Sequence, residues 1–322
     1  MADLDQTARR LATLLTGGGS GLSDPTARDL EFEPTVTLRP LEKLAPPPDV
    51  WAVDGGQALV ADARCLQLYV TRAATVRWAG GRCVQEDEGP LAAHLLGLGE
   101  GRAALAATGA PVDADAAVDV NLLRDWGEWQ AVAAAVDACG PGGVVLVDGD
   151  LQPDWRIPAA WAGALLERAG GRGIALAGIT KHSSLARGGA PLVGALEAEA
   201  ERLFGPRSTW WAQVATTRPE LGPGLVVCVA RLDPDARFAF RVDLPGGTDP
   251  AAALGALSAL CDDAAFPGYP YPLSVADRLA ACPGWVRAEA WRRVEDVLAD
   301  LGVPLEVQER AFTDRHRLME RA

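Results

Sequence analysis

The stretch "VWAVDGGQALVADARCLQLYVTRAATVRW", residues 50–78, decides the fold because it places a charge inside an apolar strand pattern. Asp54 stands between the apolar run 50–53 and the pair Gly55 and Gly56. The alternation of the residues that follow predicts two more antiparallel strands, so we interpret the stretch as a three-stranded meander whose first strand ends at Asp54. A buried carboxylate is costly unless something compensates it. The remaining sequence must therefore provide a partner for Asp54.

Downstream of the meander, helical patterns alternate with continuous apolar runs. Helices are expected over 118–143 and 158–173, and strands buried on both faces over 143–154 and 174–184. Three meandering strands followed by helix, strand, helix and strand form the RNase H-like arrangement. The sequence thus predicts an α/β fold with a mixed five-stranded sheet flanked by helices. A further hairpin is expected at 225–231 and 237–244, with helices from about residue 250 onward.

This pattern divides the chain into three parts. Residues 1–49 are expected to hold an N-terminal helix and a proline-rich arm, residues 50–285 the RNase H-like core, and residues 286–322 C-terminal helices packed on that core. No signal peptide and no membrane span of roughly 20 apolar residues is visible, so we expect a cytoplasmic protein. The six cysteines form no CxxC pair, which favours reduced core thiols over a zinc site.

The charge balance limits which molecules the protein can bind unaided. With 30 Lys and Arg against 43 Asp and Glu, the net charge is −13, so the average surface repels nucleic acid and anionic membranes. Binding of a polyanion therefore requires metal ions, a local basic patch or a partner protein. Only two of the basic residues are lysines, Lys43 and Lys181.

A second aspartate answers the question that Asp54 raises. Asp148 ends the buried strand "VVLVDGDL", and in an RNase H-like sheet that strand lies beside the first one. Two carboxylates placed together raise each other's pKa unless a cation lies between them. A divalent metal ion would remove this penalty.

Four further residues are candidates for the same site. Glu128 in the helix "LLRDWGEW" and Asp277 in "GYPYPLSVADRLA" would complete a set of oxygen ligands suited to two Mn²⁺ or Mg²⁺ ions. Tyr269 lies in a proline-rich turn, where its hydroxyl would reach a phosphate or a metal-bound water. Lys181, at the end of the strand "GITK", would neutralise a scissile phosphate.

At this point the motifs resemble a known family. The blocks "VWAVDGGQ", "LLRDWGEW", "VVLVDGDL", "GITK", "FAFRVDLP" and "GYPYPLSVADRLA" are similar, in this order, to the motifs of the NurA nucleases, over residues 50–285. The resemblance implies catalytic roles for Asp54, Glu128, Asp148 and Tyr269. The family's Asp-Gly-Ser reads Asp-Gly-Gly and Asp-Gly-Asp here, and its Ala-His reads Ala276-Asp277, which changes the expected metal preference and pH profile.

The resemblance also implies an activity and partners. It implies a Mn²⁺-dependent deoxyribonuclease, a 5′-to-3′ exonuclease and single-strand endonuclease, acting on DNA in end resection and repair. A homodimer, a HerA-type hexameric ATPase as partner, and association with the nucleoid are further expectations.

Two alternatives remain open. One is an ATP-dependent enzyme of the actin-like or sugar-kinase class, in which an Asp-Gly-Gly turn holds phosphate, although Gln57, Ala58 and Leu59 follow the glycines here. The other is a catalytically degenerate nuclease fold that serves as an adaptor for a DNA motor. Retention of three acids that destabilise the metal-free fold argues against the adaptor.

Overall fold

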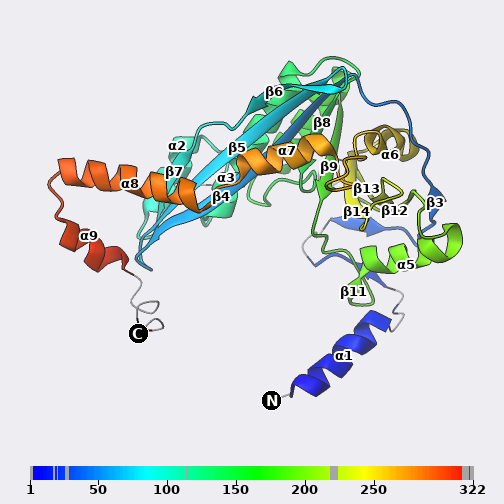
Figure 1. Cartoon of the computed structure of the whole chain (residues 1–322), viewed down its shortest axis with the longest axis horizontal. Coiled ribbons are helices and arrows are strands. Elements are labelled where there is room, and N and C mark those ends of the chain that lie inside the picture. The colour runs from blue at the N-terminus through cyan, green and yellow to red at the C-terminus, as the bar shows by residue number, and fades with distance from the viewer. Residues whose placement is uncertain are drawn as a thin grey trace.

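The computed structural model describes residues 3–16, 19, 21–25, 29–113, 115–217, 224–313 and 319. One large mixed sheet forms its centre, with helices on both faces (Figure 1). The sheet contains β2 (Leu30–Phe32), β3 (Arg39–Pro40), β4 (Asp49–Asp62), β5 (Gln67–Ala79), β6 (Arg82–Asp87), β7 (Ala92–Leu96), β8 (Val144–Asp148), β9 (Ala175–Thr180), β12 (Trp210–Thr217), β13 (Leu225–Arg231) and β14 (Phe240–Pro245). A small second sheet contains β1 (Leu22–Ser23), β10 (Ala186–Arg187) and β11 (Ala190–Pro191).

Nine helices are assigned within the described residues. They are α1 (Leu4–Thr16), α2 (Glu100–Thr108), α3 (Val120–Ala138), α4 (Ala159–Gly171), α5 (Leu192–Phe204), α6 (Pro250–Ser258), α7 (Tyr271–Ala280), α8 (Gly284–Asp300) and α9 (Leu305–Phe312). In the part of the chain that the structure covers, no helix has both the length and the apolar composition that a bilayer crossing demands.

The five central strands confirm the predicted RNase H-like core. Their order in the sheet is β6-β5-β4-β8-β9. β4 pairs antiparallel with β5, and β5 with β6, whereas β4, β8 and β9 run parallel to one another. The helices α3 and α4 make the crossovers between the parallel strands. The predicted hairpin is also present as β13 and β14, and it extends the same sheet beyond β9.

The predicted strand boundaries within 50–78 were wrong. β4 does not end at Asp54 but continues through the two glycines to Asp62, and residues 50–78 form two strands of the meander, with β6 as the third. Because Gly55 and Gly56 have no side chain, neighbouring elements can approach the backbone of β4 closely. A Cβ on Gly55 would lie 2.5 Å from Oε2 of Glu128, and one on Gly56 would overlap the backbone oxygen of Ala280.

The alternation along β4 assigns each residue to one of two cores. Val50 and Ala52 belong to the core that α6 and α7 cover, whereas Trp51 and Val53 belong to the core that α3 and α4 cover. β8 alternates in the same way, with Leu146 on the α7 face. Asp54 and Asp148 occupy the next alternate positions after Ala52 and Leu146, so both side chains are directed to the face that α7 covers.

Several elements lie away from the sheet. In Figure 1, α1 projects at the N-terminus, and α8 and α9 extend from the far end of the β4–β5 hairpin.

Trp210 and Trp211 of β12 are buried core residues. Of the six cysteines, all free, only Cys139, Cys228 and Cys261 are buried, so the prediction of core thiols was right for half of them. Residues 1–2, 17–18, 20, 26–28, 314–318 and 320–322 of the predicted terminal parts lie outside the described residues.

Candidate metal centre

Three aspartates from three elements converge at one end of the central strands. Asp54 of β4, Asp148 of β8 and Asp277 of α7 each present a carboxylate oxygen within 4.8 Å of the other two. The parallel register of Val53 with Val147 brings the first two together, and α7 packs on the face to which both are directed. These residues, called the aspartate cluster below, were all predicted as metal ligands.

Lys181 and Tyr269 border the aspartate cluster. The Lys181 ammonium donates to Asp148 Oδ2 at 2.5 Å and to Asp277 Oδ1. The same nitrogen lies 5.3 Å from the centroid of the Tyr269 ring. The Tyr269 hydroxyl is buried beside the Asp148 carboxylate, but makes no hydrogen bond of ordinary geometry. The structure therefore brings together five of the six predicted site residues.

The buried carboxylates of the aspartate cluster are only partly compensated by positive charge. Burial is the largest cause that raises the pKa of Asp54 from 3.8 to about 7, and the Asp148 charge raises it further, while Lys181 opposes both. The pKa of Asp148 is also raised by burial, against the hydrogen bond from Lys181. The pKa of Tyr269 lies well above its usual value because the phenol is buried and faces Asp148. One ammonium does not compensate three carboxylates.

Glu128 reaches this region from the opposite face. It lies on α3, is 3% exposed, and approaches β4 at the position where Gly55 has no side chain. Arg124 lies beside it, with Nη1 3.9 Å from Glu128 Oε2 and 3.2 Å from the Gly55 carbonyl oxygen, to which it donates. Burial raises the pKa of Glu128 well above its usual value, and the Asp54 charge adds to this. Glu128 is thus near Asp54, but it is not one of the residues whose oxygens meet within 4.8 Å.

The donor set fits a hard divalent cation. All the converging ligand atoms are carboxylate oxygens, which Mg²⁺ and Mn²⁺ prefer. A cation among them would keep Asp54 ionised at neutral pH by replacing the solvation that burial removes. The aspartate cluster could therefore hold a divalent metal ion.

A second charged cluster escaped the sequence analysis. Arg241 of β14 is buried and binds Asp243 through two hydrogen bonds of 2.8 and 2.9 Å, and Asp24 through one of 3.1 Å. Asp150, two residues after Asp148, lies 3.9 Å from the same guanidinium. The signal for this Arg241 network was present in "FRVDL", where two charges two residues apart share one face of an apolar strand.

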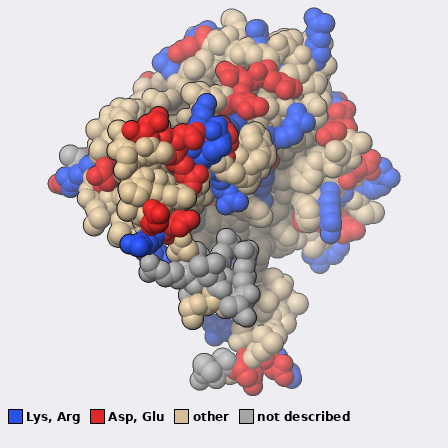
Figure 2. Space-filling model, turned by 60° about the vertical axis from the view of Figure 1, so that its left-hand side comes forward, with Lys and Arg blue, Asp and Glu red and all other residues tan. Residues whose placement is uncertain are grey.

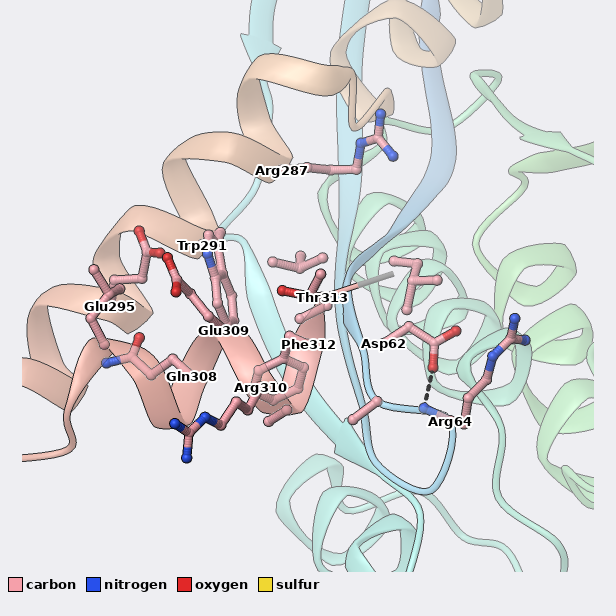
Figure 3. Close-up of a pocket in the computed structure, with 16 residues that line it drawn as sticks. Asp62, Arg64, Arg287, Trp291, Glu295, Gln308, Glu309, Arg310, Phe312 and Thr313 are labelled. Carbon is pink, nitrogen blue, oxygen red and sulfur yellow. Dashed lines mark hydrogen bonds between the residues drawn. The ribbon is translucent and has the colours of Figure 1, made fainter. Parts of the chain in front are cut away.

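A large cavity is separate from the aspartate cluster. It has a volume of about 840 Å³ and lies between the β4–β5 turn and the helices α8 and α9 (Figure 3). Trp291 and Phe312 line its apolar part, and Arg64 and Glu309 its polar part. None of the six predicted site residues lines it. The chemistry is therefore expected at the aspartate cluster rather than in this cavity.

Acidic and basic side chains are interspersed on the face that Figure 2 presents, with red groups beside blue ones. This distribution agrees with the overall excess of 43 acidic over 30 Lys and Arg residues. A polyanion approaching such a surface gains little from long-range attraction.

Comparisons with known proteins support the fold. No family model and no curated protein sequence matches the chain. The NurA nuclease from Sulfolobus solfataricus matches with a TM-score of 0.58 and 15% identity, over 82% of this chain and 88% of that one. A second NurA structure (TM-score 0.45, 10% identity, 74% and 86% covered) and the catalytic domain of human endonuclease V (0.38, 15%, 80% and 85%) also match. The match with a TM-score of 0.58 shows that the chain has the fold of the Sulfolobus solfataricus NurA nuclease, so the resemblance seen in its motifs is confirmed at the level of the fold.

Proposed function

We propose that the chain is a divalent-metal-dependent nuclease that hydrolyses phosphodiester bonds of DNA. The observation that carries the proposal is the convergence of Asp54, Asp148 and Asp277 at the ends of adjacent parallel strands in an RNase H-like sheet. The shared fold with the Sulfolobus solfataricus NurA nuclease supports it. Burial and the neighbouring Asp148 charge raise the pKa of Asp54, and such perturbed acids are frequent at functional sites.

The site residues have distinct roles in this proposal. Asp54 and Asp148 would be the central ligands of the metal ions, and Asp277 and Glu128 would complete the ligand sets. Divalent ions held there would supply an activated water and a positive charge for the leaving oxygen. Lys181 and Tyr269, which lie together on the α7 face, contact the scissile phosphate through an ammonium and a hydroxyl.

The finer assignments rest on the motif resemblance. They are the use of two ions, Mn²⁺ or Mg²⁺, and 5′-to-3′ exonuclease with single-strand endonuclease activity in DNA end resection and repair. A homodimer and a HerA-type hexameric ATPase complete the assembly, in the cytoplasm and at the nucleoid. The net charge of −13 supports a translocating partner, because unaided affinity for DNA would be low and would fall steeply with salt. The division into 1–49, 50–285 and 286–322 belongs to the same proposal.

A nuclease assay tests the proposal. Labelled linear single- and double-stranded DNA is incubated with Mn²⁺, Mg²⁺ or EDTA and with wild type, Asp54→Asn or Asp148→Asn. Each substitution keeps the side-chain shape but removes a metal ligand, so cleavage should fall by about 10²- to 10³-fold. The matched control is Asp262→Asn, an exposed aspartate paired with Lys43.

Equal cleavage by wild type and both site variants would refute the proposal, as would full activity in EDTA. Binding of ATP by a protein that leaves DNA intact would favour the kinase-like alternative. Metal binding without cleavage of any DNA would favour the adaptor.

A further inference from the structure

A row of aromatic rings leads from the core to the surface beside the aspartate cluster. Phe240 and Tyr269 are buried, at 5% and 1% exposed, whereas Phe266 is 45% exposed. The Phe266 ring centroid lies 6.0 Å from that of Tyr269 and 6.3 Å from that of Phe240. One side of the Phe266 ring is therefore fixed against the core, and the other is open to solvent.

This ring is close to the reacting centre. The Lys181 ammonium lies 5.3 Å from the same Tyr269 centroid, which places the Phe266 ring no more than 11.3 Å from the ammonium. That limit corresponds to about three stacking steps of ~3.4 Å along a DNA strand. A strand held with a phosphate at Lys181 thus has bases within reach of Phe266.

Backbone hydrogen bonds hold the turn that carries Phe266. They run from Phe266 N to Asp263 O (3.2 Å) and from Gly268 N to Cys261 O (2.8 Å). Gly268 has φ +93° and packs against Ala236 so closely that a side chain would clash. A ring fixed in this way loses little conformational entropy when a ligand stacks on it.

The neighbouring turn adds a second exposed ring and a positive charge. Phe238 is 49% exposed, and the Arg237 guanidinium lies 5.1 Å from its ring centroid. Ala236, which touches Gly268, joins this turn to the one with Phe266. Exposed aromatic rings interleaved with arginine are the surface that unpaired nucleotides bind, through stacking and phosphate contacts.

We propose that Phe266, flanked by Phe238 and Arg237, is a stacking platform for an unpaired base one to three nucleotides from the scissile phosphate. The inference rests on the proposed function and specifies its substrate. A base stacked on Phe266 must have left its duplex partner, so the site takes single strands or frayed ends rather than blunt duplex.

Binding measurements separate the platform from catalysis. They use Asp148→Asn protein with Mn²⁺ and a set of single-stranded oligonucleotides. Each oligonucleotide carries a single 2-aminopurine, placed at one of the first four positions from either end. Stacking on Phe266 should quench the fluorescence at one position. Adding Phe266→Ala should abolish this quenching and weaken single-strand binding by about 5- to 150-fold.

Further variants distinguish ring stacking from apolar bulk. Phe266→Trp should retain quenching and affinity, Phe266→Leu should lose both, and Phe204→Ala, an exposed phenylalanine at the end of α5, should change neither. An abasic site at the quenched position should weaken binding to wild-type Phe266 but not to Phe266→Ala.

If wild type cleaves DNA while Phe266→Ala keeps both quenching and affinity, the platform is wrong and the proposed function stands. Retained affinity in Phe266→Leu would overturn it too, since apolar bulk would then suffice. If wild type neither binds nor cleaves DNA, the proposed function fails, and the platform fails with it.

Discussion

Two clusters, each of three aspartates and one basic side chain, lie close together in this molecule. They differ in how fully positive charge compensates the aspartates. In the aspartate cluster the base is Lys181, whose side chain is 34% exposed, and in the Arg241 network it is Arg241, at 2%. The acids that Arg241 binds, Asp24 and Asp243, have fully buried side chains. The same count of charges thus occurs once around a fully buried basic group and once around a partly exposed one.

The difference follows from the two basic groups. A guanidinium offers a planar fork that satisfies both oxygens of Asp243 and one of Asp24, whereas an ammonium is a compact charge with three donors. Arg241 therefore pairs fully with Asp243, binds Asp24 and joins β14 to the N-terminal segment, while burial and the Asp243 charge still raise the pKa of Asp150 to about 6. Lys181 leaves Asp54 with a pKa of about 7, so its cluster can still accept a cation. The hydrogen bonds that the base makes with Asp24 and Asp243, rather than the number of acids, distinguish the Arg241 network from the aspartate cluster.

Removing the basic side chain of each cluster should test this comparison most directly. Arg241→Met removes the guanidinium that Asp24 and Asp243 bind while both carboxylates stay buried, and it should cost about 3–5 kcal/mol of unfolding free energy. Lys181→Met removes a partly exposed pair and should cost about 1 kcal/mol or less. Urea denaturation in EDTA at pH 7 measures both. Similar losses for the two variants would show that the clusters do not differ in this way.

The pH dependence of the metal-free protein sharpens the contrast. The pKa of Asp54 is about 7 in the folded state against 3.8 ordinarily, so the folded state binds the extra proton between these values. The contribution of Asp54 to stability is therefore complete below about pH 4 and is lost as the pH rises through 7, with a slope of up to ~1.4 kcal/mol per pH unit. Urea titrations from pH 4 to 8 in EDTA should show this fall, and Asp54→Asn should show a shallower one. An unchanged slope in the variant would contradict the assignment.

The smallest effect concerns the affinity for metal. Lys181 occupies ligand atoms of Asp148 and Asp277, so a cation that binds there must displace the ammonium. Because each charge-assisted hydrogen bond is worth about 1.5–3 kcal/mol, Lys181→Gln should bind Mn²⁺ at least about tenfold more tightly in calorimetry. The only other lysine supplies the control, Lys43→Gln, which should bind as wild type does. Weaker binding by Lys181→Gln would mean that the ammonium supports the metal instead of competing with it.

Sequence patterns predicted the central architecture because each of its elements leaves a local signal. Buried strands and amphipathic helices are each periodic, and their order matches the RNase H-like arrangement, in which Asp54 lies beside Asp148. Contacts between distant segments left weaker signals. The pair Gly55 and Gly56 was interpreted as lying beyond the end of the first strand, whereas it lies within β4 and permits the approach of Glu128 and Ala280 from opposite faces. Likewise, no local pattern shows that Arg241 meets Asp24, 217 residues away.

The absence of a side chain at position 56 sets the spacing between β4 and α7. Ala280 at the end of α7 rests on the backbone of Gly56, and Asp277 lies one turn earlier on the same helix. Alanine at position 56 would wedge the helix away from the sheet and move Asp277 from Asp54 without changing any acidic residue. The dimensions of the metal centre are thus determined by a residue that contributes no ligand atom to it.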